Sequence, residues 1–217
     1  MIKRPFDPSR GGGLAARWKA RAIGHYDAAA KHYERRVTRG PLAALRRRER
    51  EAVLRLADFT SPARSTVIDV GCGGGFYSRA AKRAGKWVHA IDAAPAMVDL
   101  IKRDVDVAEV ADVESFAAYR AYDVVVCCGV LEFVSSPEVA FDRLCNLCAP
   151  GGRMVIQVPR QGALGRLYRL QRRLEGLSTI LYRRERLVER AEARGLTVAG
   201  ELHPLPYNMV LAFDATG

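Results

Sequence analysis

Short apolar runs alternate with segments of helical periodicity through the middle of this chain. Five of the runs predict strands, at residues 66–70, 87–91, 105–110, 123–128 and 154–158. Most of them are nearly continuous in apolar residues, as is typical of strands that are buried on both faces of a parallel sheet. Helical segments lie between them, to about residue 83, at 95–102 and at about 137–147. Repeated strand–helix units of this kind predict an α/β fold with helices on both faces of the sheet.

The flanking segments complete this pattern. Helical periodicity rich in Arg with Ala or Leu also occurs at residues 14–37, about 42–56 and 161–194. Gly40-Pro41 separates the first two helices. Two further strands, at 196–201 and 209–213, are joined by a short connection, which suits an antiparallel hairpin because a parallel crossover needs a dozen or more residues. We therefore expect a doubly wound, mostly parallel seven-stranded sheet with an antiparallel last strand and N-terminal helices.

The chain length of 217 residues fits a single domain. Residues 1–13, which end in three glycines, read as a flexible lead-in, and residues 14–217 read as one domain. The expected parts of this domain are the N-terminal helices at 14–60, the strand–helix core at 65–158, a helical substrate-side insert at 160–195 and the terminal hairpin at 196–217.

Composition indicates a globular protein, with 49% apolar and 27% charged residues. No stretch approaches the roughly 20 apolar residues of a membrane-spanning helix, and residues 1–8 lack the apolar core of a signal peptide. The five cysteines are an odd number, which fits the cytoplasmic location that we expect. Cys145 and Cys148 have the spacing of a redox or zinc pair, but no second ligand pair exists and the stretch is apolar-periodic. We interpret them as core residues and expect no metal site.

Positive charge gathers in two blocks. The net charge is +11, and residues 1–50 hold 14 Lys and Arg against 4 Asp and Glu, whereas residues 160–195 hold 10 against 4. Such blocks suit an anionic substrate, an acidic membrane surface or nucleic acid. A solvated helix surface explains the same charges without any partner.

A glycine-dense turn after the first strand is the strongest local signal, in Val67-Ile68-Asp69-Val70-Gly71-Cys72-Gly73-Gly74-Gly75-Phe76. Glycine is needed where the backbone turns tightly or touches a ligand. A dinucleotide fold wants a small residue where Phe76 stands, and the Gly-Lys-Ser/Thr of a phosphate loop is absent. Asp69 before the turn is awkward beside a pyrophosphate and helpful beside the ammonium or sulfonium of S-adenosylmethionine. The turn therefore favours that methyl donor over a dinucleotide.

Two acidic positions follow later strands. Asp92 ends the second strand, where a carboxylate can accept hydrogen bonds from both ribose hydroxyls, and the alternative is a helix N-cap. Asp112-Val113 follows the third strand, where an adenine amino group can be met, and the alternative is a plain cap or turn.

The segment from Val67 to Val158 resembles class I S-adenosylmethionine-dependent methyltransferases, and most of all the small-molecule branch with the ubiquinone- and menaquinone-pathway enzymes. The matching segments are 69–75, Asp92, 94–98, 122–134 and 147–152. The resemblance implies a Rossmann-like methyltransferase fold, a ribose-binding Asp92 and a Met97 that packs near adenine. Two features depart from it. Glu132-Phe133 stands where many relatives carry Glu-His, so no His base is available there, and residues 160–195 match nothing in the family, although inserts at this point usually shape the substrate pocket.

These observations assign a cofactor site and leave the acceptor side open. The expected cofactor-binding residues lie at successive strand ends and are Asp69, Gly71, Cys72, Gly73, Gly75, Asp92, Ala93, Met97, Asp112, Val113 and Cys128. No catalytic residue is assigned, and the candidates are Tyr26, Tyr33, His25 and His203, with Tyr207 at the mouth of the pocket. An aromatic residue placed like Tyr26 or Tyr33 often lies over the cofactor in relatives.

The function expected from these residues is transfer of a methyl group from S-adenosylmethionine to a small-molecule acceptor. Three alternatives stay open. The Leu and Arg pattern of residues 164–177 suits a quinone or lipid methyltransferase on an anionic membrane surface, or equally a lid over the site. An RNA methyltransferase fits the charge, but no RNA-binding module or Asn-Pro-Pro-Tyr-type motif is present. A non-catalytic S-adenosylmethionine-binding module conflicts with the intact glycine turn and Asp92. The acceptor and the oligomeric state do not follow from the sequence.

Overall fold

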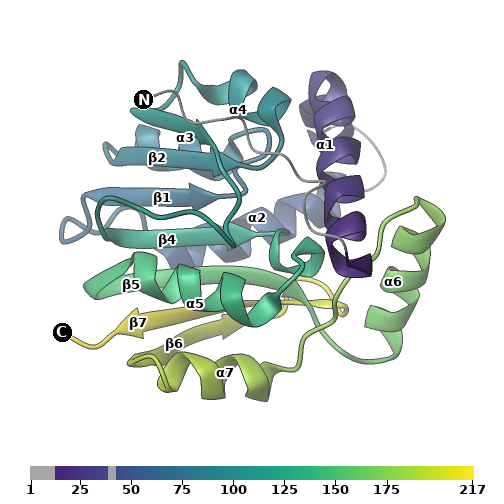
Figure 1. Ribbon diagram of the computed structural model, residues 1–217. Coiled ribbons are helices and arrows are strands. Elements are labelled where there is room, and N and C mark those ends of the chain that lie inside the picture. The colour runs from purple at the N-terminus through teal and green to yellow at the C-terminus, as the bar shows by residue number, and fades with distance from the viewer. Residues whose placement is uncertain (1–12, 39–42) are drawn as a thin grey trace.

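A seven-stranded sheet forms the centre of the computed structural model, which describes residues 13–38 and 43–217 (Figure 1). The strand order is β3-β2-β1-β4-β5-β7-β6, and every neighbouring pair is parallel except the two pairs that include β7. The strands are β1 (Thr66–Val70), β2 (Trp87–Asp92), β3 (Val107–Val110), β4 (Tyr122–Cys128), β5 (Cys148–Pro159), β6 (Leu196–Leu202) and β7 (Asn208–Ala215). The expected fold class, with its antiparallel last strand and N-terminal helices, is confirmed.

Seven α-helices and one 3₁₀ helix are present in the described residues. They are α1 (Leu14–Thr38), α2 (Ala43–Ala57), α3 (Phe76–Arg83), α4 (Pro95–Ile101), η1 (Leu131–Phe133), α5 (Pro137–Leu147), α6 (Ala163–Leu174) and α7 (Arg184–Glu192). The predicted lead-in, apart from Gly13, and the Gly40-Pro41 break lie outside the described residues. No helix in the parts of the chain that the structure describes is long and apolar enough to cross a membrane.

Helices cover both faces of the sheet and bury two separate apolar layers. On one face, α5 and α7 pack against the strands through side chains such as Phe141, Leu144 and Leu187. On the other face, α2 and α3 pack through side chains such as Val53 and Ala81. Because strand side chains alternate between faces, consecutive residues of one strand enter different layers. The free thiol of Cys145 lies buried in the first of these layers, as the apolar pattern predicts.

Helices α1 and α6 cover the end of the sheet at which the parallel strands have their carboxyl ends (Figure 1). The carboxylate of Asp27 on α1 accepts a 2.8 Å hydrogen bond from the backbone N–H of Ala96, at the start of α4. The ammonium of Lys19, about two turns earlier on α1, forms ion pairs with Asp112 and Glu114 beyond β3. These contacts hold α1 across the strand ends and enclose the space beneath it.

Two segments differ from the sequence-based expectation. The fifth strand is longer than 154–158 because the Ala149–Gly152 turn joins it as an irregularity in the β4–β5 pairing. The 160–195 segment is divided into two parts with different surroundings. Helix α6 stands at the strand ends, but α7 is a crossover helix, since Leu187 and Ala191 are buried against the sheet. Only the first half of this segment is therefore in a position to shape a pocket.

Candidate active site

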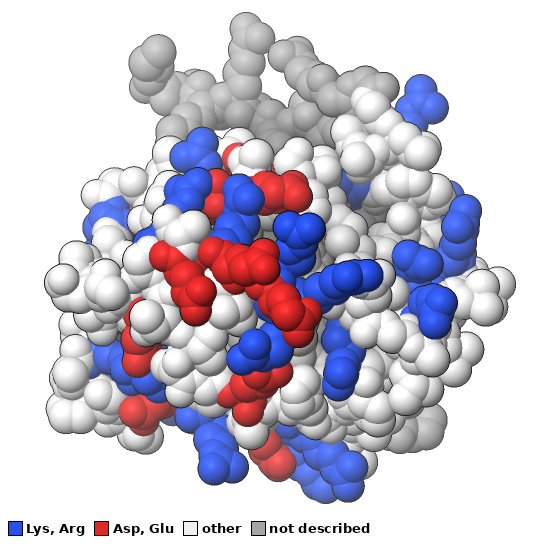
Figure 2. Space-filling view, turned by 90° about the horizontal axis from the view of Figure 1, so that it is seen from below, with Lys and Arg blue, Asp and Glu red and all other residues white. Residues whose placement is uncertain are grey.

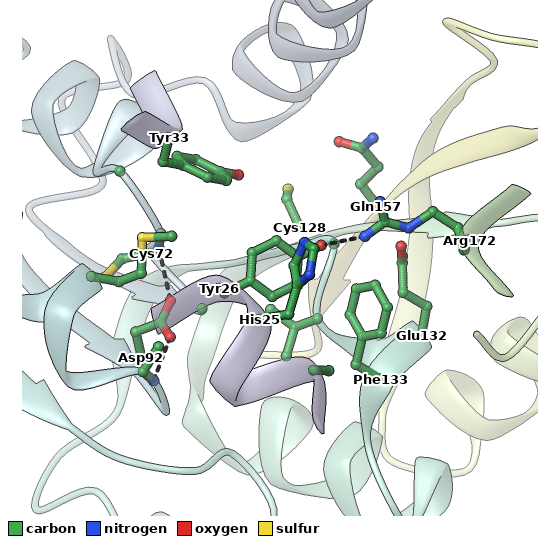
Figure 3. A pocket seen from close by; sticks show the side chains of 18 of the residues that line it. His25, Tyr26, Tyr33, Cys72, Asp92, Cys128, Glu132, Phe133, Gln157 and Arg172 are labelled. Atoms are coloured by element: carbon green, nitrogen blue, oxygen red, sulfur yellow. Dashed lines mark hydrogen bonds between the residues drawn. The ribbon is translucent and has the colours of Figure 1, made fainter. Parts of the chain in front are cut away.

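A cavity of about 630 Å³ opens at the carboxyl ends of β1, β2 and β4 and runs beneath α1 to α2 and α6 (Figure 3). This volume lies within the range of small-molecule and cofactor sites, and its position is where open α/β sheets bind ligands. Its walls differ from end to end. Asp92 and Cys72 lie at one end, and Glu132, Gln157 and Arg172 lie at the other, with Tyr26 between them (Figure 3).

The glycine turn after β1 forms one wall of the cavity through residues 71–74. Gly71 has a φ of +72°, and a Cβ on it would lie 2.0 Å from Cγ2 of Val130, so only glycine fits. The backbone N–H of Gly73 donates a 2.9 Å hydrogen bond to Oδ2 of Asp92. Gly75, by contrast, does not line the cavity. It precedes α3 with a φ of +75°, and its Cβ would meet Ile101, so its role is in packing rather than in cofactor contact.

Asp69 also lies away from the cavity, contrary to the expectation that it contacts the cofactor. Its side chain is buried within the fold, where Oδ2 accepts hydrogen bonds from the backbone N–H of Ser78 at 3.0 Å and from the Ser78 hydroxyl at 2.5 Å. Burial raises the pKa of Asp69 to about 6, although the Ser78 hydrogen bonds act against this rise. Asp69 therefore fixes the first turns of α3 behind the glycine turn.

Asp92 does face the cavity, as predicted. Besides the bond from Gly73, its Oδ1 accepts a 2.8 Å hydrogen bond from the backbone N–H of Ala94. Burial raises the pKa of Asp92 above its ordinary value, while these backbone donors oppose the shift. Ala93, Ala94 and Met97 continue the wall, and the buried Met97 packs against α1.

Asp112 and Val113 line the same end of the cavity. The Asp112 carboxylate is paired with Lys19 and also accepts a 3.0 Å hydrogen bond from the backbone N–H of Glu114. Lys19 was not among the residues predicted from the sequence, because nothing local marks one lysine of a basic helix as the partner of a distant carboxylate. Cys128, at the end of β4, lines the cavity as predicted.

Aromatic side chains roof the middle of the cavity. The Tyr33 ring lies over the glycine turn, since a Cβ on Gly74 would come within 3.0 Å of it. Tyr26 contacts Tyr33 and Phe133 edge to face, with ring centroids 6.3 Å and 5.7 Å away. His25 lines the cavity beside Tyr26. Both tyrosines and His25 are thus brought to the site.

His203 is not brought to the site. It directly follows β6 and lines a separate surface hollow, and it is 43% exposed, with Nε2 3.0 Å from Oε1 of Glu201. A role for His203 as a base at this cavity is therefore ruled out by its position. Tyr207, four residues later, does reach the cavity and stacks on Tyr168 of α6 with ring centroids 4.9 Å apart.

The far end of the cavity holds polar residues that the sequence did not single out as site residues. The buried carboxylate of Glu132 accepts a 2.8 Å hydrogen bond from the hydroxyl of Tyr168. Burial raises the pKa of Glu132 to about 7, against the lowering effect of Tyr168 and Arg172. Arg172, also on α6, donates a 2.8 Å hydrogen bond from Nη2 to the hydroxyl of Tyr26 on α1. A lone carboxylate between Leu131 and Phe133 was the one available sequence signal.

Glu49 of α2 is a second buried carboxylate at this end. Arg46 donates to its Oε2 at 3.0 Å, and Gln157 donates to its Oε1 at 3.0 Å, together with Asn208. Burial raises the pKa of Glu49, and these donors oppose the rise. The cluster ties α2 to the ends of β5 and β7 and so fixes the floor of the cavity.

The first end of the cavity fits a nucleoside-bearing cofactor such as S-adenosylmethionine. The glycine turn presents backbone at 71–74 without side chains, and Gly71 leaves no room for one. A carboxylate suited to ribose hydroxyls, Asp92, stands beside an apolar surface that includes Met97 and Val113. Polar hydrogen-bonding groups next to an apolar wall are what a ribose and an adenine ring require.

Comparison with known proteins agrees with this geometry. Residues 42–200 match a family model described as a methyltransferase domain. The chain is similar to the ubiquinone biosynthesis O-methyltransferase of Xanthomonas axonopodis pv. citri, with 38% identity over 104 residues, which are 44% of this chain and 43% of that protein. The mitochondrial ubiquinone biosynthesis O-methyltransferase of Schizosaccharomyces pombe is 32% identical over 110 residues, 46% of this chain and 40% of that protein. These matches span less than half the length of either relative.

Solved structures with a similar fold include the magnesium protoporphyrin IX methyltransferase of Synechocystis with bound S-adenosylhomocysteine. Its TM-score is 0.74 at 15% identity, over 92% of this chain and 100% of that one. The N-methyltransferase NodS of Bradyrhizobium japonicum, also with S-adenosylhomocysteine, has a TM-score of 0.69 at 17% identity over 92% of this chain and 99% of that one. At such identities the likeness establishes the fold alone.

Proposed function

The chain belongs to the methyltransferase domain family, and we propose that it transfers a methyl group from S-adenosylmethionine to a small-molecule acceptor. One observation carries this proposal. A single cavity joins a nucleoside-suited end, with Asp92 and the glycine turn, to an enclosed polar and aromatic end with Glu132, Tyr168 and Arg172. A donor and an acceptor molecule can therefore lie in one space, beneath the same roof of tyrosines.

The residues of each end have separate tasks in this proposal. S-adenosylmethionine, when bound, supplies a methyl group on a sulfonium, which is electrophilic without help from the protein. The residues expected to hold it are Asp92, Met97, Asp112 and the turn at 71–74. Tyr26 and Tyr33 cover the space between the two ends and exclude water from it. Holding two reactants in line lowers the activation free energy by up to about 7–11 kcal/mol in favourable systems.

A small-molecule acceptor is supported by the size of the enclosed space and by the relatives. The relatives that the chain resembles are named as O-methyltransferases of ubiquinone biosynthesis, but they align over less than half of their length. Helix α6 contributes Tyr168 and Arg172 to the acceptor end, and η1, α2 and β5 contribute Glu132, Glu49 and Gln157. We therefore infer the class of acceptor from the cavity, and we do not assign the particular acceptor of these relatives to this chain.

The decisive test is binding of S-adenosylmethionine and of NADH to the purified protein, measured by calorimetry. Micromolar binding of the first and no binding of the second is the expected result, because the glycine turn departs from the dinucleotide pattern at Phe76. Binding of NADH alone would replace the proposal with an oxidoreductase, and binding of neither would favour a non-catalytic module. A screen of acceptors, followed by release of S-adenosylhomocysteine, completes the experiment.

A second feature supports contact with an anionic membrane surface. The outer side of α6 exposes Leu164, Leu167, Leu170 and Leu174, which are 51–84% accessible. Exposed Arg166, Arg169 and Arg173 lie on the same helix. Figure 2 shows basic side chains without acidic ones on the side toward α6, at the right of the view, whereas both signs are mixed over the middle of that face. Apolar side chains flanked by arginines suit the boundary between lipid headgroups and acyl chains.

We propose on this basis that α6 rests on the cytoplasmic leaflet, and that apolar acceptors enter between Leu164 and Leu167, which also rim the cavity. A cytoplasmic location is supported by the five cysteines, all of which are free thiols. Co-sedimentation with anionic and with neutral vesicles tests the contact. We expect the wild type to sediment with the anionic vesicles and the variants Leu170→Glu and Leu174→Glu to remain in the supernatant. If the wild type also remains in the supernatant, the membrane contact is wrong.

A further inference from the structure

Two buried carboxylates face the acceptor end of the cavity, and they differ in how their oxygens are used. Both oxygens of Glu49 are occupied within the protein, by Arg46 on one side and by Gln157 and Asn208 on the other. Glu132 has a different arrangement. Tyr168 donates to Oε1 at 2.8 Å, and no described residue donates a hydrogen bond to Oε2. Glu132 thus keeps a free acceptor oxygen in a cavity that a ligand can enter.

The surroundings of Glu132 are mostly aromatic. Phe133 adjoins it on η1, Tyr168 and Tyr207 stack on one side, and Tyr26 closes the other side through its contact with Phe133. Leu164 and Leu167 extend this surface toward the mouth of the cavity. Such walls suit a flat aromatic molecule, while the single free carboxylate oxygen suits one hydroxyl group on it.

We propose that Glu132 is the proton acceptor of this enzyme, and that the methyl acceptor is an aromatic compound whose hydroxyl group donates to the free oxygen of Glu132. This inference rests on the proposed function, since it assigns the acceptor and the base of the same reaction. The O–H bond of the acceptor breaks, its electron pair stays on the acceptor oxygen, and the proton moves to Glu132 Oε2. The protonated Glu132 then returns this proton to water when the cavity opens to release product.

The charge environment of Glu132 supports this role. A hydroxyl acceptor arrives protonated, and a general base is most effective when its pKa lies near the working pH. Burial raises the pKa of Glu132 to about 7, so the carboxylate is both available and basic near neutrality. The titratable and charged groups that face it from the neighbouring elements are Tyr26 of α1, Arg46 and Glu49 of α2, Cys127 of β4, Tyr168 and Arg172 of α6, Tyr182 and Tyr207. The two arginines favour an oxyanion on the acceptor.

Glu132 also supplies a carboxylate next to the position where many relatives carry a histidine. The sequence carries Phe133 where many relatives have histidine, and His203 lies outside the cavity. Glu132 occupies the preceding position, on η1 after β4, and lines the acceptor end of the cavity. A carboxylate base therefore lines the same cavity as the residues expected to hold the methyl donor.

The test compares two acceptors of different acidity, catechol and 4-nitrocatechol, with wild type, Glu132→Gln and a matched control. Glu138→Gln is the control, because it is the same substitution on an exposed residue of the neighbouring helix α5. Release of S-adenosylhomocysteine gives the rate, and calorimetry gives the affinity of each protein for S-adenosylmethionine and for catechol. Wild type is expected to methylate both compounds.

Glu132→Gln should lower the rate with catechol by about 100-fold or more, as expected for loss of a general base. Its loss with 4-nitrocatechol should be under about tenfold, because the nitro group makes the hydroxyl acidic enough to ionise without a base. Affinities of Glu132→Gln for S-adenosylmethionine and catechol should stay within about threefold of wild type, and Glu138→Gln should behave as wild type throughout.

Each other outcome overturns part of this account. An equal loss with both compounds would make Glu132 a structural residue, and no loss would remove it from the reaction. A wild type that binds S-adenosylmethionine but methylates neither compound would overturn the hydroxyl acceptor and leave the proposed function standing. A wild type that does not bind S-adenosylmethionine would overturn the proposed function itself.

Discussion

Oδ2 of Asp92 accepts a 2.9 Å hydrogen bond from the backbone N–H of Gly73, and this bond ties the end of β2 to the turn that follows β1. The same carboxylate holds the backbone N–H of Ala94 through its other oxygen. Asp92 thus positions two walls of the cavity while its remaining lone pairs face the space where a ribose would lie. It shapes the site and is available to contact the cofactor.

Asp92→Ala should therefore weaken S-adenosylmethionine binding by about 10- to 100-fold, because hydrogen bonds to a charged carboxylate contribute about 1.5–3 kcal/mol each. Calorimetry measures the affinity. Asp99→Ala on α4 is the matched control, since that carboxylate is 67% exposed and pairs with Lys102 at the surface. Equal affinities for Asp92→Ala and wild type would remove Asp92 from the cofactor site.

Substitution of Gly71 tests how closely the turn is packed. Gly71 and Gly85 both have positive φ, +72° and +76°, but a Cβ would lie 2.0 Å from Val130 at the first and in open space at the second. Gly85→Ala should lower the free energy of unfolding by about 1–2 kcal/mol, because alanine is strained in the left-handed backbone conformation. Gly71→Ala should lower the free energy of unfolding by about 1–3 kcal/mol more, because its Cβ also clashes with Val130. It should impair cofactor binding as well. Denaturant unfolding of both variants measures the difference, and similar losses would show that Val130 moves aside freely.

The fold class could be predicted from the sequence because its signals are local. The apolar runs, the glycine breaks and the short connection between β6 and β7 each report on a few neighbouring residues, and the structure has the expected strands with shifts of a few positions at their ends. Asp92 was predicted for the same reason, since a carboxylate at the last residue of a strand must lie at the sheet edge.

The rest of the site depends on which way a side chain faces and on distant partners. Asp69 lies inside β1, one residue before its end, and the alternation of the strand turns it toward Ser78 rather than toward the cavity. Glu132 and Tyr168 are 36 residues apart in the chain, and they meet because α6 folds back over the strand ends. No periodicity or spacing in the sequence encodes a contact of that kind.

The buried Asp69 should make stability depend on pH. The pKa of Asp69 in the folded protein, about 6, lies above the ordinary value of 3.8. Its contribution to the free energy of unfolding is therefore fully present below about pH 4 and is lost as pH rises through 6. Relative to Asp69→Asn, wild type should therefore lose about 2–3 kcal/mol of unfolding free energy between pH 4 and pH 7.5. Denaturant titrations of both proteins at these two pH values measure the change. A constant difference would contradict the raised pKa.

The hydroxyl of Tyr168 should act on the reaction through Glu132, whereas its ring belongs to the wall of the acceptor end. Its hydroxyl donates to Oε1 of Glu132, which favours the ionised carboxylate and lowers its pKa, while its ring stacks on Tyr207. Tyr168→Phe keeps the stacked ring and removes only the donor, so the pKa of Glu132 should rise further. Because the base must be ionised, kcat/KM for catechol should rise with pH, with a midpoint near pH 7 in wild type and at a higher pH in Tyr168→Phe. The value of kcat/KM reached at high pH should be nearly the same in both proteins. A lower plateau at an unchanged midpoint would assign Tyr168 to acceptor binding instead.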